Sequence, residues 1–255
     1  MPFRHTQECM VVEERKMNDI NTQRRNFLKT SVGAAAVAIA PGMLLFDMAH
    51  GKSEPVNGKV RWGMLIDAGQ CKEGCNDCVT ACNKENGLGS GTLTPTSAQW
   101  IRKIEIKDVS SGRELSLPMM CQHCESPPCV DVCPTGASFK RPDGIVLVDK
   151  HLCIGCRYCM MACPYKARSF VHEPLHDQNP DVPRGKGTVE SCTLCVHRLD
   201  VGKQPACAEA CPNKAILFGD LNDPNSEIAQ KVHIVASVQV RADLQLNPSI
   251  RYMGL

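Results

Sequence analysis

The stretch Cys153-Ile-Gly-Cys156-Arg-Tyr-Cys159-Met-Met-Ala-Cys163-Pro164 decides the fold, because it places four cysteines within eleven residues. Three closely spaced thiols on a tight loop can wrap one face of a metal group. Cys159 and Cys163 stand four positions apart with no Gly or Pro between them, which predicts one helical turn. Pro164 ends that turn, because proline cannot continue a helix. The turn is therefore predicted to bridge two metal groups.

Three further stretches repeat this pattern with one loop lengthened. The four motifs are Cys71-x3-Cys75-x2-Cys78-x3-Cys82, Cys121-x2-Cys124-x4-Cys129-x3-Cys133, Cys153-x2-Cys156-x2-Cys159-x3-Cys163 and Cys192-x2-Cys195-x11-Cys207-x3-Cys211. Proline follows the last cysteine of every motif except the first, where Asn83 stands instead. Such runs are typical of [4Fe–4S] clusters, in which the fourth thiolate of a run ligates the other cluster of a pair. The sequence predicts four [4Fe–4S] clusters with these sixteen cysteines as iron ligands, and Cys9, far upstream, is not a candidate.

Two other uses of cysteine fit the spacing less well. Disulfides form outside the cytoplasm and sixteen is an even number, but repeated x2 spacings followed by proline are a poor disulfide pattern. Zinc sites pair Cys-x2-Cys units across a longer loop, whereas here three cysteines lie together and the fourth is offset. A zinc- or disulfide-stabilised binding protein remains the alternative from another functional class.

Chain distances predict an α+β fold of two tandem bacterial-ferredoxin-like modules, one inserted within the other. Only 19 residues separate Cys133 from Cys153, so motifs two and three form an inner module, and motifs one and four pair across it. Strands are expected at 60–66, 100–107 and 145–148, with a turn at 140–144 and a polar return loop at 173–186. The predicted parts are a signal peptide (1–51), an outer module (58–108 and 187–222), an inner module (113–172) and a C-terminal extension (223–255).

These motifs resemble the four-cluster electron-transfer subunits of membrane-linked oxidoreductases, the dimethyl sulfoxide reductase iron–sulfur family, over roughly residues 58–222. In that family three cysteines of a motif bind one cluster and the fourth binds the partner's. The resemblance implies the ligand sets Cys71, Cys75, Cys78 and Cys211; Cys192, Cys195, Cys207 and Cys82; Cys121, Cys124, Cys129 and Cys163; and Cys153, Cys156, Cys159 and Cys133. It also implies an electron-transfer subunit with no substrate site of its own, which is therefore not an enzyme by itself.

A narrower resemblance is to the DsrO family, the periplasmic iron–sulfur subunits of DsrMKJOP-type membrane complexes in dissimilatory sulfur metabolism. It rests on the extra residue between Cys71 and Cys75 and on residues 241–244 and 247–255. The implied partners are an integral membrane, quinone-interacting subunit of the NrfD/DsrP type and a multihaem cytochrome c. The electron subunit of a molybdenum enzyme or of a nitrite-reduction system is the alternative within the class.

The N-terminal sequence has the features of an export signal. Arg24 and Arg25 precede a charge-free run of 16 residues, 31–46, which resembles a twin-arginine signal except that Gln23 stands where Ser or Thr is usual. As a helix this run would span about 24 Å, short of the roughly 30 Å hydrocarbon core, so a removable signal is favoured over a membrane anchor. We expect a periplasmic protein, held at the membrane through its partner subunits.

The other residues argue against nucleic-acid binding, catalysis and haem ligation, and they leave the role of two basic residues open. Net charge is +2 and aromatic residues are 4% of the chain, which argues against a nucleic-acid partner. No catalytic constellation is visible, and the histidines at 123, 151, 172, 176, 197 and 233 lack the Cys-x2-Cys-His haem pattern, so surface or packing roles are expected. Lys166 and Arg168 can either raise the potential of a nearby cluster or form a solvated basic turn.

Overall fold

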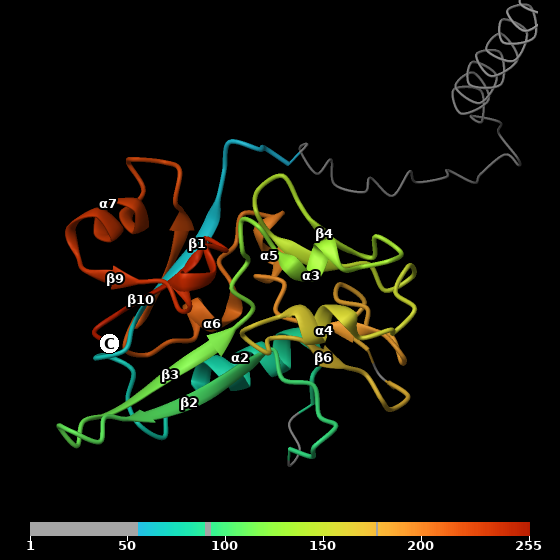
Figure 1. Ribbon diagram of the computed structural model, residues 1–255, viewed down its shortest axis with the longest axis horizontal. Helices are drawn as coiled ribbons and strands as arrows, with labels where there is room; N and C mark the ends of the chain where they lie inside the picture. Colours follow the sequence, from blue (N-terminus) through green and yellow to red (C-terminus); the bar gives the residue numbers. More distant parts are fainter. Residues whose placement is uncertain (1–55, 90–92, 177) are drawn as a thin grey trace, which may run out of the picture. The chain divides into compact units, whose positions relative to one another are not determined.

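The computed structural model describes residues 56–89, 93–176 and 178–255 (Figure 1). The predicted signal peptide and Cys9 lie outside these residues, so the twin-arginine interpretation stays a prediction. Within the described ranges, none of the helices combines the length and the apolar character that crossing a bilayer requires.

One four-stranded sheet carries the amino- and carboxyl-terminal parts of the described chain. Its order is β8–β1–β10–β9, formed by Ile216–Asp220, Trp62–Asp67, Ile250–Met253 and Ser237–Val238. Strand β1 confirms the strand predicted at 60–66, and its Met64 and Ile66 are fully buried. β10 pairs with β1 in parallel, while β8 pairs with β1 antiparallel. The region 223–255, expected as an extension, thus supplies two strands of this sheet.

Helix α7, Glu227–Ile234, packs against β8 and β1. It begins at Ser226, whose Oγ accepts a hydrogen bond from the backbone N–H of Ala229 (3.2 Å) and so satisfies one free donor of the first turn. Ile228 on its inner face is 1% exposed. The helix therefore buries one apolar face against the sheet.

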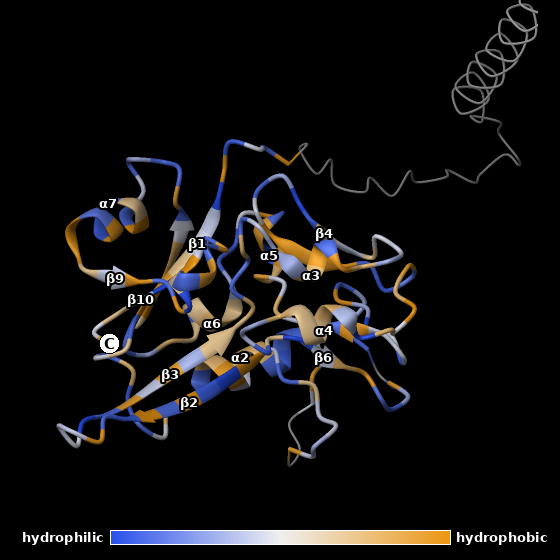
Figure 2. Cartoon of the chain, in the orientation of Figure 1, coloured by the Kyte–Doolittle hydropathy of each residue, from blue (hydrophilic) through white to orange (hydrophobic). Residues whose placement is uncertain are grey.

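Short strand pairs frame the cysteine motifs. β2 and β3, Ile101–Lys107 and Glu114–Met120, form an antiparallel hairpin that confirms the strand predicted at 100–107. Strand β5, Val146–Val148, confirms the strand predicted at 145–148. The smaller pairs are β4 with β5, Ser138–Lys140 and Val146–Val148, and β6 with β7, Ser169–Phe170 and Val189–Glu190. In Figure 2 hydrophobic residues colour the ribbon in several places, among them beside the label α3 and in the loop next to α7.

Each motif contributes at least one helix, and four of these helices pack in pairs. They are α2 (Asp77–Asn86), α3 (Pro128–Asp131), α4 (Tyr158–Ala162) and α6 (Ala206–Glu209), with α5 (Val196–Leu199) and a 3₁₀ turn, η1 (Ala242–Leu244), in addition. α2 packs against α6, and α3 packs against α4. The first pair joins motifs one and four, and the second joins motifs two and three.

The prediction that the last two cysteines of every motif share a helical turn is correct only for α2, which contains Cys78 and Cys82. Cys133, Cys163 and Cys211 lie just beyond the ends of their helices. The reason is the proline that follows each of them, which disfavours helical backbone at the preceding residue. Cys163 accordingly has extended backbone, with φ −75° and ψ 111°. Asn83 lets α2 continue to Gly87, whose left-handed conformation ends it.

Candidate metal centres

The structure brings the sixteen cysteines together in four groups of four, each combining three thiols of one motif with the last thiol of another. All sixteen are free thiols. Group 1 is Cys71, Cys75, Cys78 and Cys211, which line one cavity. Group 4 is Cys153, Cys156, Cys159 and Cys133, which line a second cavity. The loops therefore wrap a common space rather than pairing thiols one to one.

Within groups 2 and 3 the thiols lie close enough to repel one another, and so do Cys78 with Cys82 and Cys129 with Cys159, which belong to neighbouring groups. Group 2 is Cys192, Cys195, Cys207 and Cys82; burial, followed by repulsion from the other three thiols, holds the pKa of Cys192 well above its ordinary value. Group 3 is Cys121, Cys124, Cys129 and Cys163. Burial raises the pKa of Cys124 to about 12, with further contributions from Cys129 and Cys163. The family resemblance implies one cluster for each of these sets of four, and that assignment stays a prediction.

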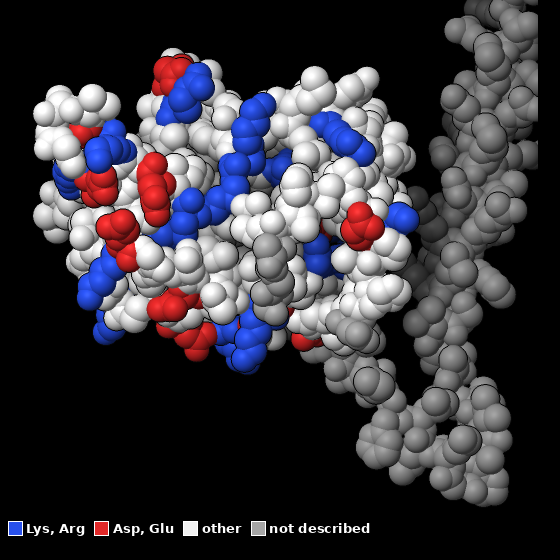
Figure 3. All heavy atoms as spheres, turned by 90° about the horizontal axis from the view of Figure 1, so that it is seen from below, with Lys and Arg blue, Asp and Glu red and all other residues white. Residues whose placement is uncertain are grey.

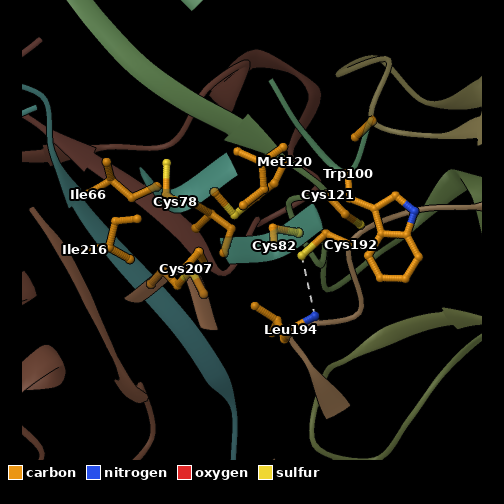
Figure 4. Close-up of a cluster of buried hydrophobic side chains, with 14 of the residues drawn as sticks. Ile66, Cys78, Cys82, Trp100, Met120, Cys121, Cys192, Leu194, Cys207 and Ile216 are labelled. Carbon is orange, nitrogen blue, oxygen red and sulfur yellow. Dashed lines mark hydrogen bonds between the residues drawn. The ribbon is translucent and has the colours of Figure 1, made fainter. Parts of the chain in front are cut away.

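Burial separates the four groups into two kinds. Every cysteine of groups 2 and 3 is buried, at 4–5% exposure in group 2 and 7–8% in group 3. Group 1 has three half-buried thiols, and group 4 has an exposed one, Cys156. Figure 4 shows Cys78, Cys82, Cys121, Cys192 and Cys207 in one buried core. Groups 2 and 3 thus lie inside the molecule and groups 1 and 4 reach its surface.

The motif loops depend on backbone shapes that few residues tolerate. Gly155, between Cys153 and Cys156, has φ +70°, and a Cβ there would lie 2.2 Å from the carbonyl oxygen of Gly187. Arg157, Cys195 and His123 also adopt positive φ within or beside the Cys-x2-Cys loops. Non-glycine residues in this region carry strain that surrounding contacts must hold. The loops are therefore shaped by the fold to direct several thiols inward.

The Cys-Pro turns deliver backbone donors to sulfur. Three residues after Cys133, Cys163 and Cys211, the N–H donates to the carbonyl of that cysteine, at 3.1–3.3 Å. Just beyond two of these turns, the N–H of Ser138 donates to Cys133 Sγ and the N–H of Ala215 to Cys211 Sγ, both at 3.3 Å. Backbone donors to sulfur stabilise thiolate charge and tune clusters. The sequence reasoning did not find these donors, because their role depends on where the turn places an N–H.

Three polar side chains also contact the thiols. Lys103 Nζ, from β2, donates to Cys71 Sγ at 2.8 Å. Asn86 Nδ2, at the end of α2, lies 3.5 Å from Cys82 Sγ. Arg168 Nη2 lies 3.1 Å from Cys129 Sγ. Lys103 and Asn86 were missed from the sequence; for Arg168 the solvated-turn interpretation is wrong, since it is 5% exposed, whereas Lys166 is exposed.

The histidines take structural roles where the structure gives them partners. His123 is 1% exposed and its Nδ1 accepts a hydrogen bond from the N–H of Val146 (3.0 Å). Burial, followed by the charge of Arg168, lowers the pKa of His123 to about 3, so this ring is neutral. His197 Nε2 pairs with Glu85 at 2.8 Å. Both agree with the packing roles expected from the sequence.

The donor set fits iron–sulfur clusters. Thiolate ligands alone select soft centres, chiefly zinc or iron–sulfur clusters. Groups 1 and 4 each surround a cavity. Burial raises the pKa of thiols in every group, for example that of Cys121 to about 12, so metal binding must release protons from them. A multi-atom cluster supplies the positive iron that makes four buried thiolates tolerable.

Comparison with known proteins gives the same chemistry. Residues 113–221 match the family described as the 4Fe-4S dicluster domain. The chain is 40% identical to the Hdr-like menaquinol oxidoreductase iron-sulfur subunit 1 of Archaeoglobus fulgidus, over 92% of this chain and 98% of the relative. It is 35% identical to a tetrathionate reductase subunit of Salmonella typhimurium (93% and 90% covered) and 40% identical to protein NrfC of Escherichia coli K12 (89% and 93% covered). The chain therefore belongs to the family of [4Fe–4S] ferredoxin-type electron-transfer subunits.

Proposed function

We propose that this chain is a periplasmic electron-transfer subunit that relays single electrons through four [4Fe–4S] clusters. The observation that carries the proposal is the interleaved grouping of sixteen free cysteines into four groups of four. Each group would hold one cluster, so all sixteen cysteines are iron ligands. When bound, each cluster accepts and releases one electron. The protein's own residues hold the clusters, exclude water from two of them and set the charge around them.

The grouping supports a linear order of clusters, 1–2–3–4. α2 carries Cys78 of group 1 and Cys82 of group 2, and α4 with its end carries Cys159 of group 4 and Cys163 of group 3. In α2, one helical turn brings the thiols of groups 1 and 2 within about 6 Å along the axis, whereas Cys163 lies just beyond the end of α4. Thiols of groups 2 and 3 share one buried core cluster. This order supports the two-module architecture, with the inner module of motifs two and three inserted in the outer one.

The two surface-reaching groups are the proposed electron ports. Around group 4 the side chains of Leu152, Ile154, Tyr158 and Met161 are 52–75% exposed, and exposed apolar surface of this kind marks a protein interface. Around group 1 the exposed residues include Lys72, Glu73 and Asp77, which are charged. Figure 3 shows that one face of the molecule mixes a row of basic side chains with acidic ones beside it. The two ports therefore offer different surfaces to two different partners.

The proposed partners are a quinone-linked integral membrane subunit of the NrfD/DsrP type and a second redox subunit, such as a multihaem cytochrome c. The name of the Archaeoglobus fulgidus relative, a menaquinol oxidoreductase subunit, supports the quinone-linked partner. The Salmonella typhimurium relative belongs to tetrathionate reductase, which supports a role in dissimilatory sulfur metabolism. Together with the DsrO-like first motif, these names favour a sulfur-linked complex.

The electron-transfer subunit of a nitrite-reduction system or of a molybdenum enzyme is the second candidate. Purification of the native complex separates the two. Sulfur-linked subunits co-purifying with this chain support the first assignment, and a nitrite reductase or molybdenum subunit in the complex supports the second.

Metal analysis tests the cluster proposal directly. Protein purified anaerobically should contain about sixteen iron and about sixteen acid-labile sulfide per chain, from four complete ligand sets. Stoichiometric zinc with little iron would instead support the zinc-stabilised binding protein.

Export is tested separately. Arg24→Lys with Arg25→Lys should leave cluster-loaded precursor in the cytoplasm, because paired arginines address a folded protein to the twin-arginine route. Cell fractionation followed by immunoblotting measures this. Unchanged periplasmic delivery would contradict the twin-arginine assignment.

A further inference from the structure

The guanidinium of Arg168 lies between two thiol groups. Its Nη2 is 3.1 Å from Cys129 Sγ of group 3 and 2.8 Å from Ser138 Oγ. The charges that act on it most strongly are those of Cys129, Cys121 and Cys159, the last of which belongs to group 4. Arg168 is thus held at the junction of groups 3 and 4, nearest to group 3.

This buried cation has thiols as its neighbours instead of a carboxylate. Arg168 is 5% exposed, and its Nε and Nη1 have no hydrogen-bond partner in the part of the chain that the structure describes. The nearby buried carboxylate, Glu190, is paired with Arg184 at 2.7 Å. Burying an unpaired charge is strongly unfavourable, so a buried arginine needs a counter-charge. The thiolates and sulfides of the clusters in groups 3 and 4 are the counter-charge that this position offers.

We propose that Arg168 is a fixed positive charge that raises the reduction potential of the group 3 cluster, and to a smaller extent that of group 4. This inference rests on the proposed function, because it requires the clusters. A cluster bound in group 3 would take up one electron on reduction from the redox partner or mediator that reduces it, with no bond made or broken. The reduced cluster is the more negative state, so a nearby guanidinium, which is always charged, stabilises it more than the oxidised state. Low solvent access strengthens this interaction.

The neighbouring lysine provides a matched control. Lys166 carries the same charge two residues earlier in the same turn, but its side chain is exposed. Water and salt screen an exposed charge far more than a buried one. Lys166→Gln and Arg168→Gln therefore remove equal formal charge from nearly the same position in the sequence, and differ in burial and in contact with sulfur.

The test is a potentiometric titration followed by electron paramagnetic resonance on the anaerobically purified, cluster-loaded protein. In Arg168→Gln the reduced-to-oxidised ratio of the group 3 cluster at a fixed potential should fall at least tenfold, which is about 59 mV for one electron. The group 4 cluster should shift less, and clusters 1 and 2 should not shift. Lys166→Gln should leave every ratio within about twofold of wild type, as expected for a screened surface charge.

A second variant covers the case in which Arg168→Gln does not keep its iron. Arg168→Lys retains charge but not the planar fork of donors, so the group 3 ratio should fall about threefold. A fully loaded variant whose group 3 ratio equals that of wild type, or of Lys166→Gln, overturns the inference while leaving the cluster proposal intact. Wild-type protein without iron overturns both, so the two failures are distinguishable by metal content.

Discussion

Groups 2 and 3 are both fully buried, yet their polar surroundings differ. Near group 2 the polar side chain that contacts sulfur is the neutral amide of Asn86, and the nearby carboxylate of Glu85 is paired with Arg198 at 2.9 Å. Near group 3 the corresponding side chain is the guanidinium of Arg168. Burial alone would give the two clusters similar surroundings, so the neighbouring charge is what separates them. We expect the group 3 cluster to have the higher potential of the two.

The two groups also differ in the backbone that links them to their neighbours. α2 joins groups 1 and 2 as a continuous helix of 10 residues, because Asn83 follows Cys82. The link between groups 3 and 4 is made of α3 and α4, of 4 and 5 residues, each ended before a Cys-Pro pair. The first link runs through the interior of a helix, and the second runs through helix ends. Adding a proline to the first should therefore destabilise the protein more than removing a proline from the second.

The largest expected effect is the loss of one cluster when a shared thiol is removed. Cys163→Ser should perturb the cluster held by Cys121, Cys124 and Cys129, and Cys82→Ser should perturb the group 2 cluster. The iron content should fall by up to about four atoms per chain in each variant. Electron paramagnetic resonance assigns the lost signal.

Reference variants make this assignment decisive. Cys124→Ser marks the signal of group 3 and Cys156→Ser marks that of group 4. Should Cys163→Ser change the same signal as Cys156→Ser, the motifs ligate locally and the interleaved scheme is wrong. The comparison is made on preparations in which the other three signals survive, because losing one cluster can destabilise its module.

The next effect concerns the two backbone links. Asn83→Pro introduces proline into the interior of α2, and should lower the free energy of unfolding by about 3 kcal/mol. Pro164→Ala removes proline from a helix end, where Cys163 already has extended backbone. This change should alter the free energy of unfolding by less than about 1 kcal/mol. Anaerobic guanidinium unfolding followed by circular dichroism measures both. Equal losses in the two variants would contradict the difference between a helix interior and a helix end.

Much of this architecture follows from local sequence. Composition and turn residues predict the strands at 60–66, 100–107 and 145–148, and β1, β2 and β5 confirm them. The spacing of the cysteines and the family resemblance predict their grouping; the structure places the thiols of groups 1 and 4 each around one cavity, and the ligand sets stay a prediction. These features depend on residues close in the chain, or on a motif repeated four times.

Contacts between distant segments were not predictable in the same way. β10 pairs in parallel with β1 although 186 positions separate their first paired residues, Met64 and Ile250. Lys103 reaches Cys71 from a strand 32 residues away. Whether Arg168 was solvated or buried depended on Ser138, 30 residues earlier in the chain. Each of these contacts is decided by packing between elements, which no local pattern encodes.

A smaller shift is expected at group 1, where Lys103 contacts Cys71. Lys103→Gln should lower the reduced-to-oxidised ratio of the group 1 cluster about threefold at a fixed potential, less than the change at Arg168, because this site is nearer to solvent and is screened. The same titration measures it. Lys72→Gln, which removes an exposed lysine beside Cys71, is the control and should shift the ratio less. A group 1 shift as large as that of Arg168→Gln at group 3 would show that burial does not decide the effect.

The smallest effect is expected at Asn86, and it completes the comparison between groups 2 and 3. Its amide lies 3.5 Å from Cys82 Sγ and donates to the carbonyl of Cys82 at 2.9 Å, while its Oδ1 is buried without a partner in the described chain. A neutral donor stabilises thiolate charge about half as well as a charged one, so Asn86→Leu should change the group 2 ratio by less than about twofold. Removing the unpaired oxygen offsets the lost hydrogen bond, so the free energy of unfolding should change by less than about 1 kcal/mol. A group 2 shift equal to that of Arg168→Gln at group 3 would mean that hydrogen bonding to sulfur, and not net charge, separates the two buried clusters.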